Sequence, residues 1–598
     1  MRFRVSVVAS LLIAGLLAGL GSSSVVVAQV APPEAEPVAV GTGGAVATVD
    51  PYATHAAIRT LRSGGNAIDA AVTAAAVLGV VEPYSCGIGG GGFMVIYRAD
   101  RERVVTVDSR EMAPEAYHPE VFIDPATGAP IPFAERVTSG LGVGVPGTLM
   151  GWDEALDRYG TISLARALEP AIRLAQRGFV VDDTLEQQTA ANLERFQAIT
   201  PTAQLFLTPE GEPRPAGSTF KNPDLARTYR DIARSGVKSF YDGPIADAIV
   251  DAVADPPVEP DSGLNVRPGL MTVDDMAEYE ARIRRPTATG YRGYDIYGMG
   301  PPSSGGSTVG ESLNIMEGFD LGGIPREEAL HYYLESSRLA FADRNAYLGD
   351  PEFVDVPLQG LLSDEFAADR RSNIGPEAAQ SPVPPGDPFP YQDDPSPSGP
   401  AAVTAAAGVG GSTTHLTVSD AEGNVVSYTF TIESIGGSGI TVPGHGFLLN
   451  NELTDFDPVP PHPNAPEARK RPRSSMSPTI VVRDGAPVLA LGSPGGSTII
   501  TTVQQLLMNS IDFGMSLPEA IAEPRLSQRN TAATNAEPAF LGTPDAAALI
   551  ARGHSFTETA EIGAATGIAF LPDGTVQAAA EPVRRGGGSA AVTHPLGP

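Results

Sequence analysis

Residues 413–431, TTHLTVSDAEGNVVSYTFT, are the stretch of the sequence that decides the fold. Two runs rich in β-branched and aromatic residues, 413–419 and 425–432, flank a short connection that carries Asp, Gly and Asn. This pattern predicts a β-hairpin. We expect its first strand to be buried and to begin at Thr413.

The segment before this hairpin has the opposite character. Residues 378–412 are dense in Pro, Gly, Ser and Ala. Such a composition cannot bury enough apolar surface to offset the entropy lost on ordering, so we expect the segment to be flexible. Cleavage before Thr413 would free an α-amine beside a hydroxyl, the arrangement of an N-terminal threonine nucleophile. Because threonine is common in any strand, the pattern alone leaves both interpretations open.

Patterns elsewhere predict a mixture of helices and strand pairs. We expect helices over residues 55–80 with a break at Gly64-Gly65, and over 164–177, 184–196, 327–347 and 500–513. Further strands are expected at 93–97, at 445–449 and in a hairpin over 479–492 that turns on Asp484-Gly485. Helices outside and strand pairs inside indicate an α/β layered sandwich with antiparallel sheets.

Composition narrows the choice of partners. With 70 acidic and 40 basic residues the formal net charge is −30, and no Lys/Arg-rich run is present. A surface of this sign argues against nucleic acid and anionic membranes as partners. Cys86 is the only cysteine. Because no intramolecular disulfide can form, we expect a large packed core to hold the fold together.

The N-terminus has the features of a targeting segment. Arg2 and Arg4 precede an apolar run, and Val26-Val27-Ala28 provides a small-residue exit. This order predicts a secretory signal peptide over residues 1–28. We therefore expect an exported protein, periplasmic or extracellular, with no membrane association after the signal is removed.

One glycine motif is misleading. Gly87, Gly89 and Gly92 satisfy G-x-G-x-x-G, but a helix pattern precedes them and a strand pattern follows. A dinucleotide site requires the reverse order, so we interpret this loop as a place where backbone segments pass closely. The sequence also lacks the common zinc, EF-hand and G-x-S-x-G spacings. We expect neither a metal nor an organic cofactor.

Longer motifs extend along almost the whole chain. They are GNAIDAAV, VVEPYSCGIGGGGFM, DSREMAP, PPSSGG, AFADRNAYLGDP, TTH, FLLNNELTDF, KRPRSSMSPTIVV and GSPGGSTIITTVQQLLMNSIDFG, between about Asp50 and Arg585. In this order they resemble the γ-glutamyltranspeptidases (glutathione hydrolases) of the N-terminal nucleophile hydrolase superfamily. The resemblance implies an α+β fold, a four-layer αββα sandwich.

The resemblance also implies how the chain is processed and how it reacts. Thr413 matches the family's nucleophile and cleavage point, where its hydroxyl attacks the Ser412 carbonyl. A large subunit (29–412) and a small subunit (413–598) result, and they form one intertwined domain. The new α-amine serves as the base. Thr431 matches the threonine that orients the nucleophile, and Gly495 and Gly496 match the oxyanion-hole amides.

Other matched positions concern recognition of the donor. Arg110, Ser474 and Ser475 match groups that bind the donor's α-carboxylate, while Glu452 and Asp455 match the pair that holds its α-ammonium. The chain departs from the pattern at one position: Glu433 stands where many members have asparagine. A carboxylate still accepts from an ammonium but lacks the amide's donors, so donor specificity is less fixed than reaction class.

Two further expectations concern the surroundings of the site. The loop over 456–469 is short for members with a lid, which implies an open cleft. His415 shares a strand face with Thr413, whereas Thr414 points away. We expect a structural role for His415 because the α-amine already supplies the base.

The implied activity is cleavage of the γ-glutamyl amide of glutathione-like donors, with transfer to water or to an amino acid or peptide acceptor. Two alternatives stay open. One is a cephalosporin or glutaryl-type acylase with the same nucleophile, which Glu433 keeps open. The other is an unprocessed, inactive paralogue that only binds its ligand.

Overall fold

The computed structural model describes residues 33–393 and 412–596. The predicted signal peptide and residues 394–411 of the predicted flexible segment lie outside the described residues. No helix among the described residues combines the length and the apolar character needed to cross a membrane.

One antiparallel sheet organises the described part of the chain. Its 13 strands follow the order β6-β3-β2-β10-β9-β1-β17-β16-β12-β11-β8-β7, with β18 paired to β1. They are β1 (Val38–Thr48), β2 (Gly91–Arg98), β3 (Arg103–Asp108), β6 (Arg282–Arg284), β7 (Thr287–Tyr291), β8 (Tyr294–Gly298), β9 (Thr414–Ser419), β10 (Val425–Thr431), β11 (Thr479–Arg483), β12 (Ala486–Gly492), β16 (Thr566–Phe570), β17 (Val576–Ala580) and β18 (Ser589–Pro595). Short strands outside it are β4 (Phe179–Val180), β5 (Thr219–Phe220), β13 (Leu526–Ser527), β14 (Thr534–Ala536) and β15 (Phe556–Glu558).

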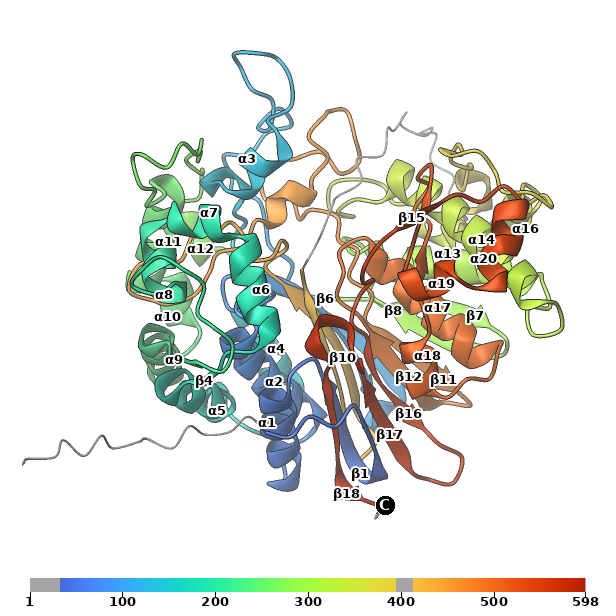
Figure 1. Ribbon diagram of the computed structural model, residues 1–598, viewed down its shortest axis with the longest axis horizontal. Coiled ribbons are helices and arrows are strands. Elements are labelled where there is room, and N and C mark those ends of the chain that lie inside the picture. The colour runs from blue at the N-terminus through green and yellow to red at the C-terminus, as the bar shows by residue number, and fades with distance from the viewer. Residues whose placement is uncertain (1–32, 394–411, 597–598) are drawn as a thin grey trace, which may run out of the picture.

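Helices cover both outer faces of this sheet (Figure 1). One side carries α1 (Pro51–Arg62), α2 (Ala67–Val81), α4 (Thr148–Tyr159), α5 (Leu164–Arg177), α6 (Asp183–Ala191), α7 (Leu193–Gln197), α8 (Thr200–Phe206), α9 (Pro223–Ser235), α10 (Lys238–Tyr241), α11 (Pro244–Ala254) and α12 (Val273–Ala277), with α3 (Phe133–Val137) above them. The other carries α13 (Gly305–Glu317), α14 (Arg326–Tyr347), α15 (Leu358–Leu361), α16 (Asp364–Arg371), α17 (Thr498–Ile511), α18 (Leu517–Ala522), α19 (Pro538–Leu541) and α20 (Pro544–Ala551).

The sheet bends back on itself, which makes four layers. Strand β2 sends Met94 and Ile96 into the core beneath α1 and α2, and Phe93 and Val95 into a second core shared with β11 and β12. The two sheet halves also contact directly, because the Ser427 hydroxyl of β10 donates to a carbonyl of β12 at 3.0 Å. The predicted αββα sandwich is confirmed, and its two β layers belong to one continuous sheet.

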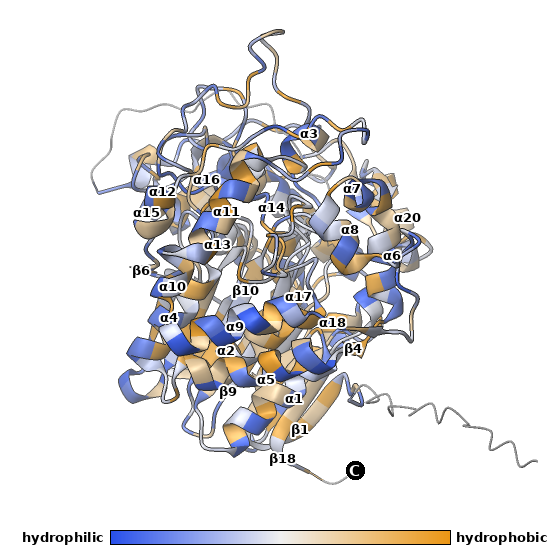
Figure 2. Ribbon diagram, turned by 90° about the vertical axis from the view of Figure 1, so that its left-hand side faces the viewer, coloured by the Kyte–Doolittle hydropathy of each residue, from blue (hydrophilic) through white to orange (hydrophobic). Residues whose placement is uncertain are grey.

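The amphipathic helices form where periodicity predicts them. Helix α5 buries Leu164, Ala167, Leu168 and Ala171, which recur at the spacing of one helix face. Figure 2 shows hydrophilic and hydrophobic residues alternating along α9 in the same manner. Helix α2 differs because all of its residues are buried. The Gly64-Gly65 break before it is confirmed, whereas the helix predicted over 184–196 is divided at Asn192 into α6 and α7.

One predicted strand is absent. Residues 445–449 form no ladder; only Leu448 bridges to Thr441. Gly444 and Gly446 both adopt a φ of 73°. Left-handed backbone at these glycines turns the chain and prevents an extended run. The apolar residues of this stretch therefore belong to a loop that packs against the core. The strand prediction is wrong.

The described part of the predicted flexible segment is held by contacts. The backbone N–H of Ala378 donates to the carbonyl of Arg552 at 2.8 Å, and that of Gly386 donates to Asp343 at 2.6 Å. Phe389 is buried. Over residues 378–393 composition alone predicts less order than the structure shows, because partners from distant parts of the chain satisfy its backbone.

The glycine loop before β2 packs against the backbone at Thr431 and Leu448. It follows helix α2 and precedes strand β2, as the sequence predicts. A Cβ added to Gly90 would lie 1.9 Å from the carbonyl oxygen of Thr431, and one added to Gly89 would lie 2.0 Å from that of Leu448. Glycine is required here because backbone passes against backbone.

We predict that Gly90→Ala moves the end of β10 and destabilises the fold by about 1–3 kcal/mol, the usual cost of overpacking. Gly542→Ala is the matched control, because a Cβ there meets nothing within 4 Å. Thermal melting of both variants measures the difference. Equal melting temperatures for the two would contradict the close-approach role of Gly90.

Candidate active site

The predicted nucleophile lies at the open end of the β9–β10 hairpin, opposite its turn. Thr413 directly precedes β9 and is 4% exposed. Its hydroxyl donates to Oγ1 of Thr431, the last residue of β10, at 3.0 Å. The backbone N–H of Glu433 donates to the same Thr431 oxygen at 2.8 Å. Thr431 therefore holds the Thr413 hydroxyl proton and leaves the lone pairs of Thr413 Oγ1 free.

The backbone at this point is strained. Thr413 has a φ of 71° and Glu433 a φ of 79°, both in the left-handed region. A β-branched residue rarely adopts this conformation, and each such residue costs about 1–3 kcal/mol. The N–H of Ser412 donates to the carbonyl of Glu433 at 2.6 Å, which ties the two strained positions together.

An arginine that sequence reasoning missed fixes the backbone of Thr413. Arg585 donates to the carbonyl of Thr413 at 2.8 Å and to the hydroxyl of Ser85 at 2.7 Å. The Ser412 hydroxyl donates to the same Ser85 oxygen at 2.9 Å. No local signal marks Arg585, because its partners lie far away in the sequence.

His415 is buried two residues after Thr413 and is uncharged at neutral pH. Its ring nitrogens hydrogen-bond to Thr429 at 2.7 Å and to Thr417 at 3.2 Å. Burial lowers the pKa of His415 to about 3. The imidazole is neutral at physiological pH and both nitrogens are occupied, so a structural role is the one that fits.

The glycine pair predicted for the oxyanion hole lies directly before helix α17. Gly495 and Gly496 have φ values of 133° and 57°, which favour glycine. Gly496 lines the same cavity as Thr413. The start of a helix carries partial positive charge on its free N–H groups, which suits a developing oxyanion.

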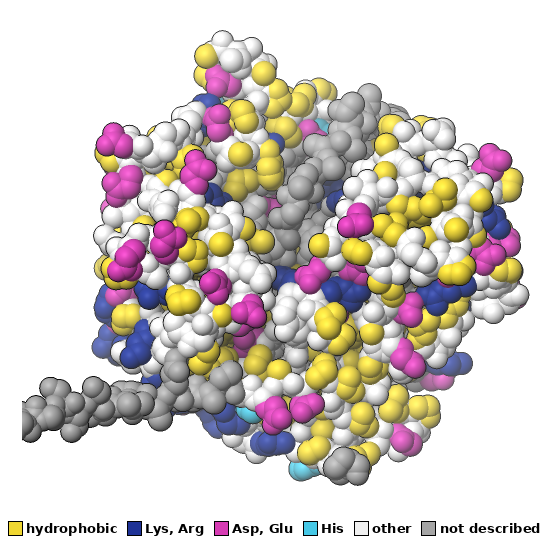
Figure 3. All heavy atoms as spheres, in the orientation of Figure 1, with side chains coloured by type: hydrophobic (Ala, Val, Ile, Leu, Met, Phe, Trp, Pro, Cys, Tyr) yellow, Lys and Arg dark blue, Asp and Glu magenta, His cyan; other side chains and the backbone are white. Residues whose placement is uncertain are grey.

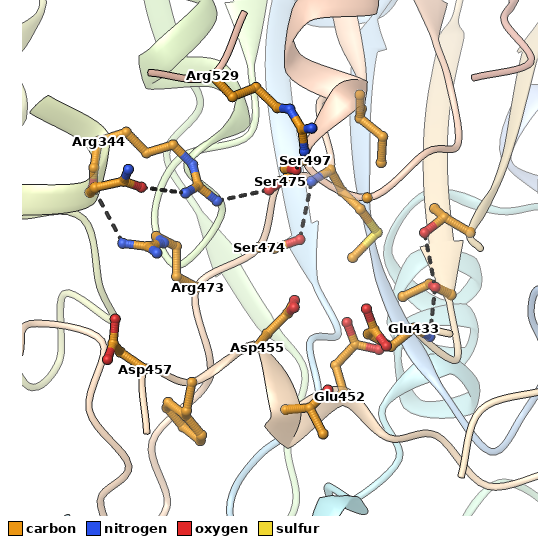
Figure 4. Close-up of a pocket in the computed structure, with 18 of the residues that line it drawn as sticks. Arg344, Glu433, Glu452, Asp455, Asp457, Arg473, Ser474, Ser475, Ser497 and Arg529 are labelled. Carbon is orange, nitrogen blue, oxygen red and sulfur yellow. Dashed lines mark hydrogen bonds between the residues drawn. The ribbon is translucent and has the colours of Figure 1, made fainter. Parts of the chain in front are cut away.

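Thr413, Thr431 and Gly496 line one cavity of about 240 Å³. Figure 3 shows the surface hollowed between the two helical halves, and Figure 4 shows the charged side chains around the cavity. Its polar and charged lining residues are Arg110, Arg136, Arg344, Asn345, Thr413, Thr431, Glu433, Glu452, Thr454, Asp455, Asp457, Arg473, Ser474, Ser475, Ser497, Arg529 and Thr531. Among the predicted site residues only Gly495 and Ser412 are missing here; they line a neighbouring cavity with Ser497 and Arg529.

Arg110 and the acidic pair predicted to hold opposite ends of a donor contact each other. Arg110 is 1% exposed, forms an ion pair with Glu452 and reaches Asp455 at 2.5 Å. It also donates to the carbonyl oxygens of Pro472 and Arg473, each at 3.1 Å. Most of its N–H groups are therefore engaged within the protein.

Burial affects the carboxylates around Arg110. It raises the pKa of Glu452 above its ordinary value and that of Glu111 to about 8, although the Arg110 charge acts in the opposite direction. Burial, followed by the neighbouring Asp455 charge, raises the pKa of Glu433 to about 7. Glu433 accepts from Asn451 at 2.6 Å and from Ser434 at 2.5 Å. Glu111 and Glu433 are thus only partly ionised near neutral pH.

Each of the two predicted serines accepts one hydrogen bond through its hydroxyl oxygen. Ser474 Oγ accepts from the N–H of Met476 at 3.1 Å, and Ser475 Oγ accepts from Arg344 at 2.8 Å. Neither hydroxyl donates to a group of the described residues, so both protons are free to donate to a ligand. A carboxylate would use such donors, so the arrangement fits the predicted role. Arg344, which orients Ser475, is a second residue that sequence reasoning missed.

One group of possible metal ligands occurs within residues 33–393 and 412–596. The ligand atoms of His331, Glu335 and His554 lie within 4.8 Å of one another. His331 and His554 hydrogen-bond to each other at 2.8 Å, and Glu335 accepts from the N–H of Ala379 and from Arg338, each at 3.1 Å. None of the three lines the cavity with Thr413. These hydrogen bonds explain why the three side chains lie together: they connect helix α14 to the residues before β15.

The chain matches known proteins over most of its length. The family model described as gamma-glutamyltranspeptidase matches residues 53–591. A glutathione hydrolase proenzyme of Bacillus subtilis (strain 168) is 41% identical over 559 residues, 92% of each chain. One of Escherichia coli (strain K12) is 37% identical over 593 residues, 95% of this chain and 96% of that protein. The crystal structure of a cephalosporin acylase from Bacillus halodurans has a TM-score of 0.81 and 30% identity, covering 94% of this chain and 97% of that one.

We predict that Arg110→Met destabilises the fold by about 3–5 kcal/mol at pH 8, because it leaves buried carboxylates without their cation. The loss should shrink at pH 5.5, because burial raises the pKa of Glu111 to about 8 and that carboxyl group is then protonated. Arg136→Met is the matched control, since Arg136 lines the same cavity without a carboxylate in ion-pair distance among the described residues. Urea unfolding followed by the fluorescence of Trp152, the only tryptophan, measures both. A loss independent of pH would contradict the electrostatic role.

Proposed function

The chain belongs to the gamma-glutamyltranspeptidase family, and we propose that it is a self-processing enzyme that cleaves the γ-glutamyl amide of glutathione and similar donors. The γ-glutamyl group passes to water or to an amino acid or peptide acceptor. The observation that carries this proposal is the hydrogen-bonded Thr413–Thr431 pair, which opens into a cavity with acidic groups, Arg110 and two serine donors.

Processing begins at the strained peptide bond. The Thr413 hydroxyl attacks the Ser412 carbonyl carbon, the C–N bond breaks, an ester forms, and water hydrolyses it. The φ angle of Thr413 includes the Ser412 carbonyl carbon, so breaking the bond removes the constraint that costs free energy. The products are a large subunit (29–412) and a small subunit (413–598).

Strand pairing supports the view that the two subunits remain one domain. Strands β9 and β10 of the small subunit pair with β1 and β2 of the large one, in the middle of the sheet. Separating the subunits would expose these central strands along their whole length. We therefore infer that the processed chains stay intertwined.

The freed α-amine acts as the base in the acyl-transfer reaction. An α-amine has a pKa of about 8, so part of it is neutral near pH 7. It takes the proton from Oγ1 of Thr413 as that oxygen attacks the γ-amide carbon, and it returns the proton to the leaving amine. The amides of Gly495 and Gly496 stabilise the oxyanion, and water or an acceptor amine then resolves the acyl-enzyme.

The cavity offers opposite charges to the two ends of an amino-acid headgroup. Glu433, Glu452 and Asp455, labelled in Figure 4, would hold the α-ammonium. Arg110, with the hydroxyls of Ser474 and Ser475, would receive the α-carboxylate. Charged hydrogen bonds of this kind are about twice as strong as neutral ones. Such a pair of subsites selects γ-glutamyl compounds over ordinary peptides.

We place the mature enzyme outside the cytoplasm, periplasmic or extracellular, on the signal-peptide pattern of residues 1–28. Its partners are small γ-glutamyl donors and amino acid or peptide acceptors.

An acylase activity is the second candidate. The similarity to a cephalosporin acylase structure favours it, and so does the raised pKa of Glu433, which weakens the attraction for an ammonium. An acyl group without an α-ammonium would then be less strongly disfavoured. The inactive binding paralogue has no observation in its favour, because the hydroxyl pair of the nucleophile is intact.

We predict that Thr413→Ala leaves a single uncut chain without activity, because no hydroxyl remains to attack Ser412. Thr414→Val is the matched control: the Thr414 hydroxyl is buried and has no hydrogen-bond partner among the described residues, so this variant should still be cut. Intact mass and N-terminal sequencing distinguish the two. A cut Thr413→Ala chain, or a small fragment that does not begin with TTHLTV, would overturn the assignment of the nucleophile.

We also predict that binding of the donor headgroup strengthens as pH rises through about 7. Below its raised pKa Glu433 is neutral, and above it the carboxylate attracts the α-ammonium. The inhibition constant of L-glutamate should fall by about three- to tenfold between pH 6 and 8, about 0.6–1.4 kcal/mol. Glu433→Gln should remove this step, and Asp457→Asn should keep it. The same step in Glu433→Gln would assign it to another group.

A further inference from the structure

Three arginines on one wall of the cavity have no ionic partner among the described residues. Arg344, Arg473 and Arg529 line the cavity that contains Thr413, and Figure 4 shows them on the side opposite Glu433. No carboxylate of the described residues lies within 4.0 Å of their guanidinium nitrogens, unlike Arg110 with its acidic pair. Arg344 is only 8% exposed.

Neutral oxygen atoms hold these three arginines in place. Arg344 donates to Ser304 and Ser475, each at 2.8 Å. Arg529 donates to Ser497 and, at 2.9 Å, to Asn535. Arg473 reaches only carbonyl oxygens of helix α14 and its end, at 3.3 and 3.4 Å. The Nε–H groups of Arg473 and Arg529 are buried with no partner in the described part of the chain.

Such an arrangement costs free energy in the empty protein. Desolvation disfavours each charge, and like charges add to the cost. Burial lowers the pKa of Arg473 to about 10, and burial together with the Arg473 charge lowers that of Arg344. An anion bound between the three side chains would remove this cost.

Most of the acidic residues that line the cavity are engaged with other groups. Asp455 pairs with Arg110, and Glu433 accepts from Asn451 and Ser434. Asp457 is the exception: it lies 3.6 Å from His462, but burial lowers the pKa of that imidazole to about 4, so the neutral ring forms no ion pair with it. The three arginines outnumber this one carboxylate, and no carboxylate of the described residues lies within 4.0 Å of them.

The position of Arg529 indicates which part of a substrate meets this wall. Arg529 bonds to Ser497, the residue after Gly496, and lines both the main cavity and the neighbouring one of about 600 Å³. The neighbouring cavity also includes Ser412 and Gly495. Arg529 thus lies between the two cavities that adjoin the reacting carbonyl.

We propose that Arg344, Arg473 and Arg529 form a subsite for a carboxylate carried by the leaving group of the donor or by the acceptor. This inference rests on the proposed γ-glutamyl transfer. The donor's own α-carboxylate has Arg110, Ser474 and Ser475, so the arginine wall serves a second anion. The substrate class is γ-glutamyl amides whose amine part bears a carboxylate close to the bond that breaks.

Two chromogenic donors that differ by one carboxylate test the subsite. These are γ-glutamyl-4-nitroanilide and γ-glutamyl-3-carboxy-4-nitroanilide, which share the acyl group and the reporter. The quantity measured is the ratio of kcat/KM for the carboxylated donor to that for the neutral donor. Because the electronic effect of the ring substituent is the same for every variant, a change in this ratio reports contact with the carboxylate.

Arg473→Met and Arg529→Met should each lower this ratio by about five- to fiftyfold, as expected for a lost hydrogen bond to a charged group. Arg529→Lys should recover part of the ratio. Arg136→Met is the matched control, because it removes a cavity arginine that stacks over Phe122 and Phe133 instead. Its ratio should stay within about twofold of the wild type, the margin left by screened long-range charge.

The possible outcomes separate the inference from the proposed function. Cleavage of neither donor by the wild type would refute the γ-glutamyl reaction itself. Cleavage of both with unchanged ratios in the variants would leave that reaction standing and overturn the subsite. Should the variants fail to fold, the wild-type ratio is measured between 20 and 500 mM NaCl. A ratio above one that falls with salt supports the subsite, and a ratio independent of salt refutes it.

Discussion

Pairing of strand β9 with strand β10 is the interaction on which the rest of the site depends. Its register places Thr414 opposite Phe430 and His415 opposite Thr429, so Thr413 comes opposite Thr431. A slip by one residue would turn every side chain of β10 to the other face and separate the two hydroxyls. Register is fixed here because both faces of the hairpin are buried, and because β10 also pairs with β2 over seven residues. The close approach of Gly90 to the end of β10 adds a further restraint.

The electrostatics of the cavity follow from how its charges are divided. Arg110 is paired with carboxylates, and burial raises the pKa of Glu452. On the opposite wall Arg344 and Arg529 bond to neutral oxygens, and no carboxylate of the described residues lies within ion-pair distance of them. One side of the cavity therefore combines a cation with acids, and the other side favours an anion. A zwitterionic headgroup draws Glu433 toward its charged form, which couples binding to proton release near neutral pH.

Local sequence patterns predicted those helices and turns that depend on neighbouring residues alone. The hairpin on Asp484-Gly485 and helix α14 lie where turn residues and periodicity put them. The strand expected at 445–449 failed because glycine φ angles turn the chain there. Motifs located the predicted site residues but not their pairing: nothing in the sequence shows that Arg110 contacts Glu452 and Asp455. The three arginines of the opposite wall were missed for a related reason: what distinguishes them is that no described carboxylate lies within ion-pair distance, and only the three-dimensional structure shows this.

The contacts around the cleavage point divide according to which side of the bond they hold. On the Thr413 side, Arg585 binds the carbonyl and Thr431 binds the hydroxyl, and both contacts survive the proposed cleavage. On the other side, Ser412 binds the Glu433 carbonyl and the Ser85 hydroxyl, and these are the groups that its departure would free. Cleavage would therefore release the strained φ of Thr413 without releasing the nucleophile. It would also free the Glu433 carbonyl and the Ser85 hydroxyl from their hydrogen bonds with Ser412. The proposed cleavage would thus remove the strain of the precursor and supply the base that the buried, neutral His415 does not provide.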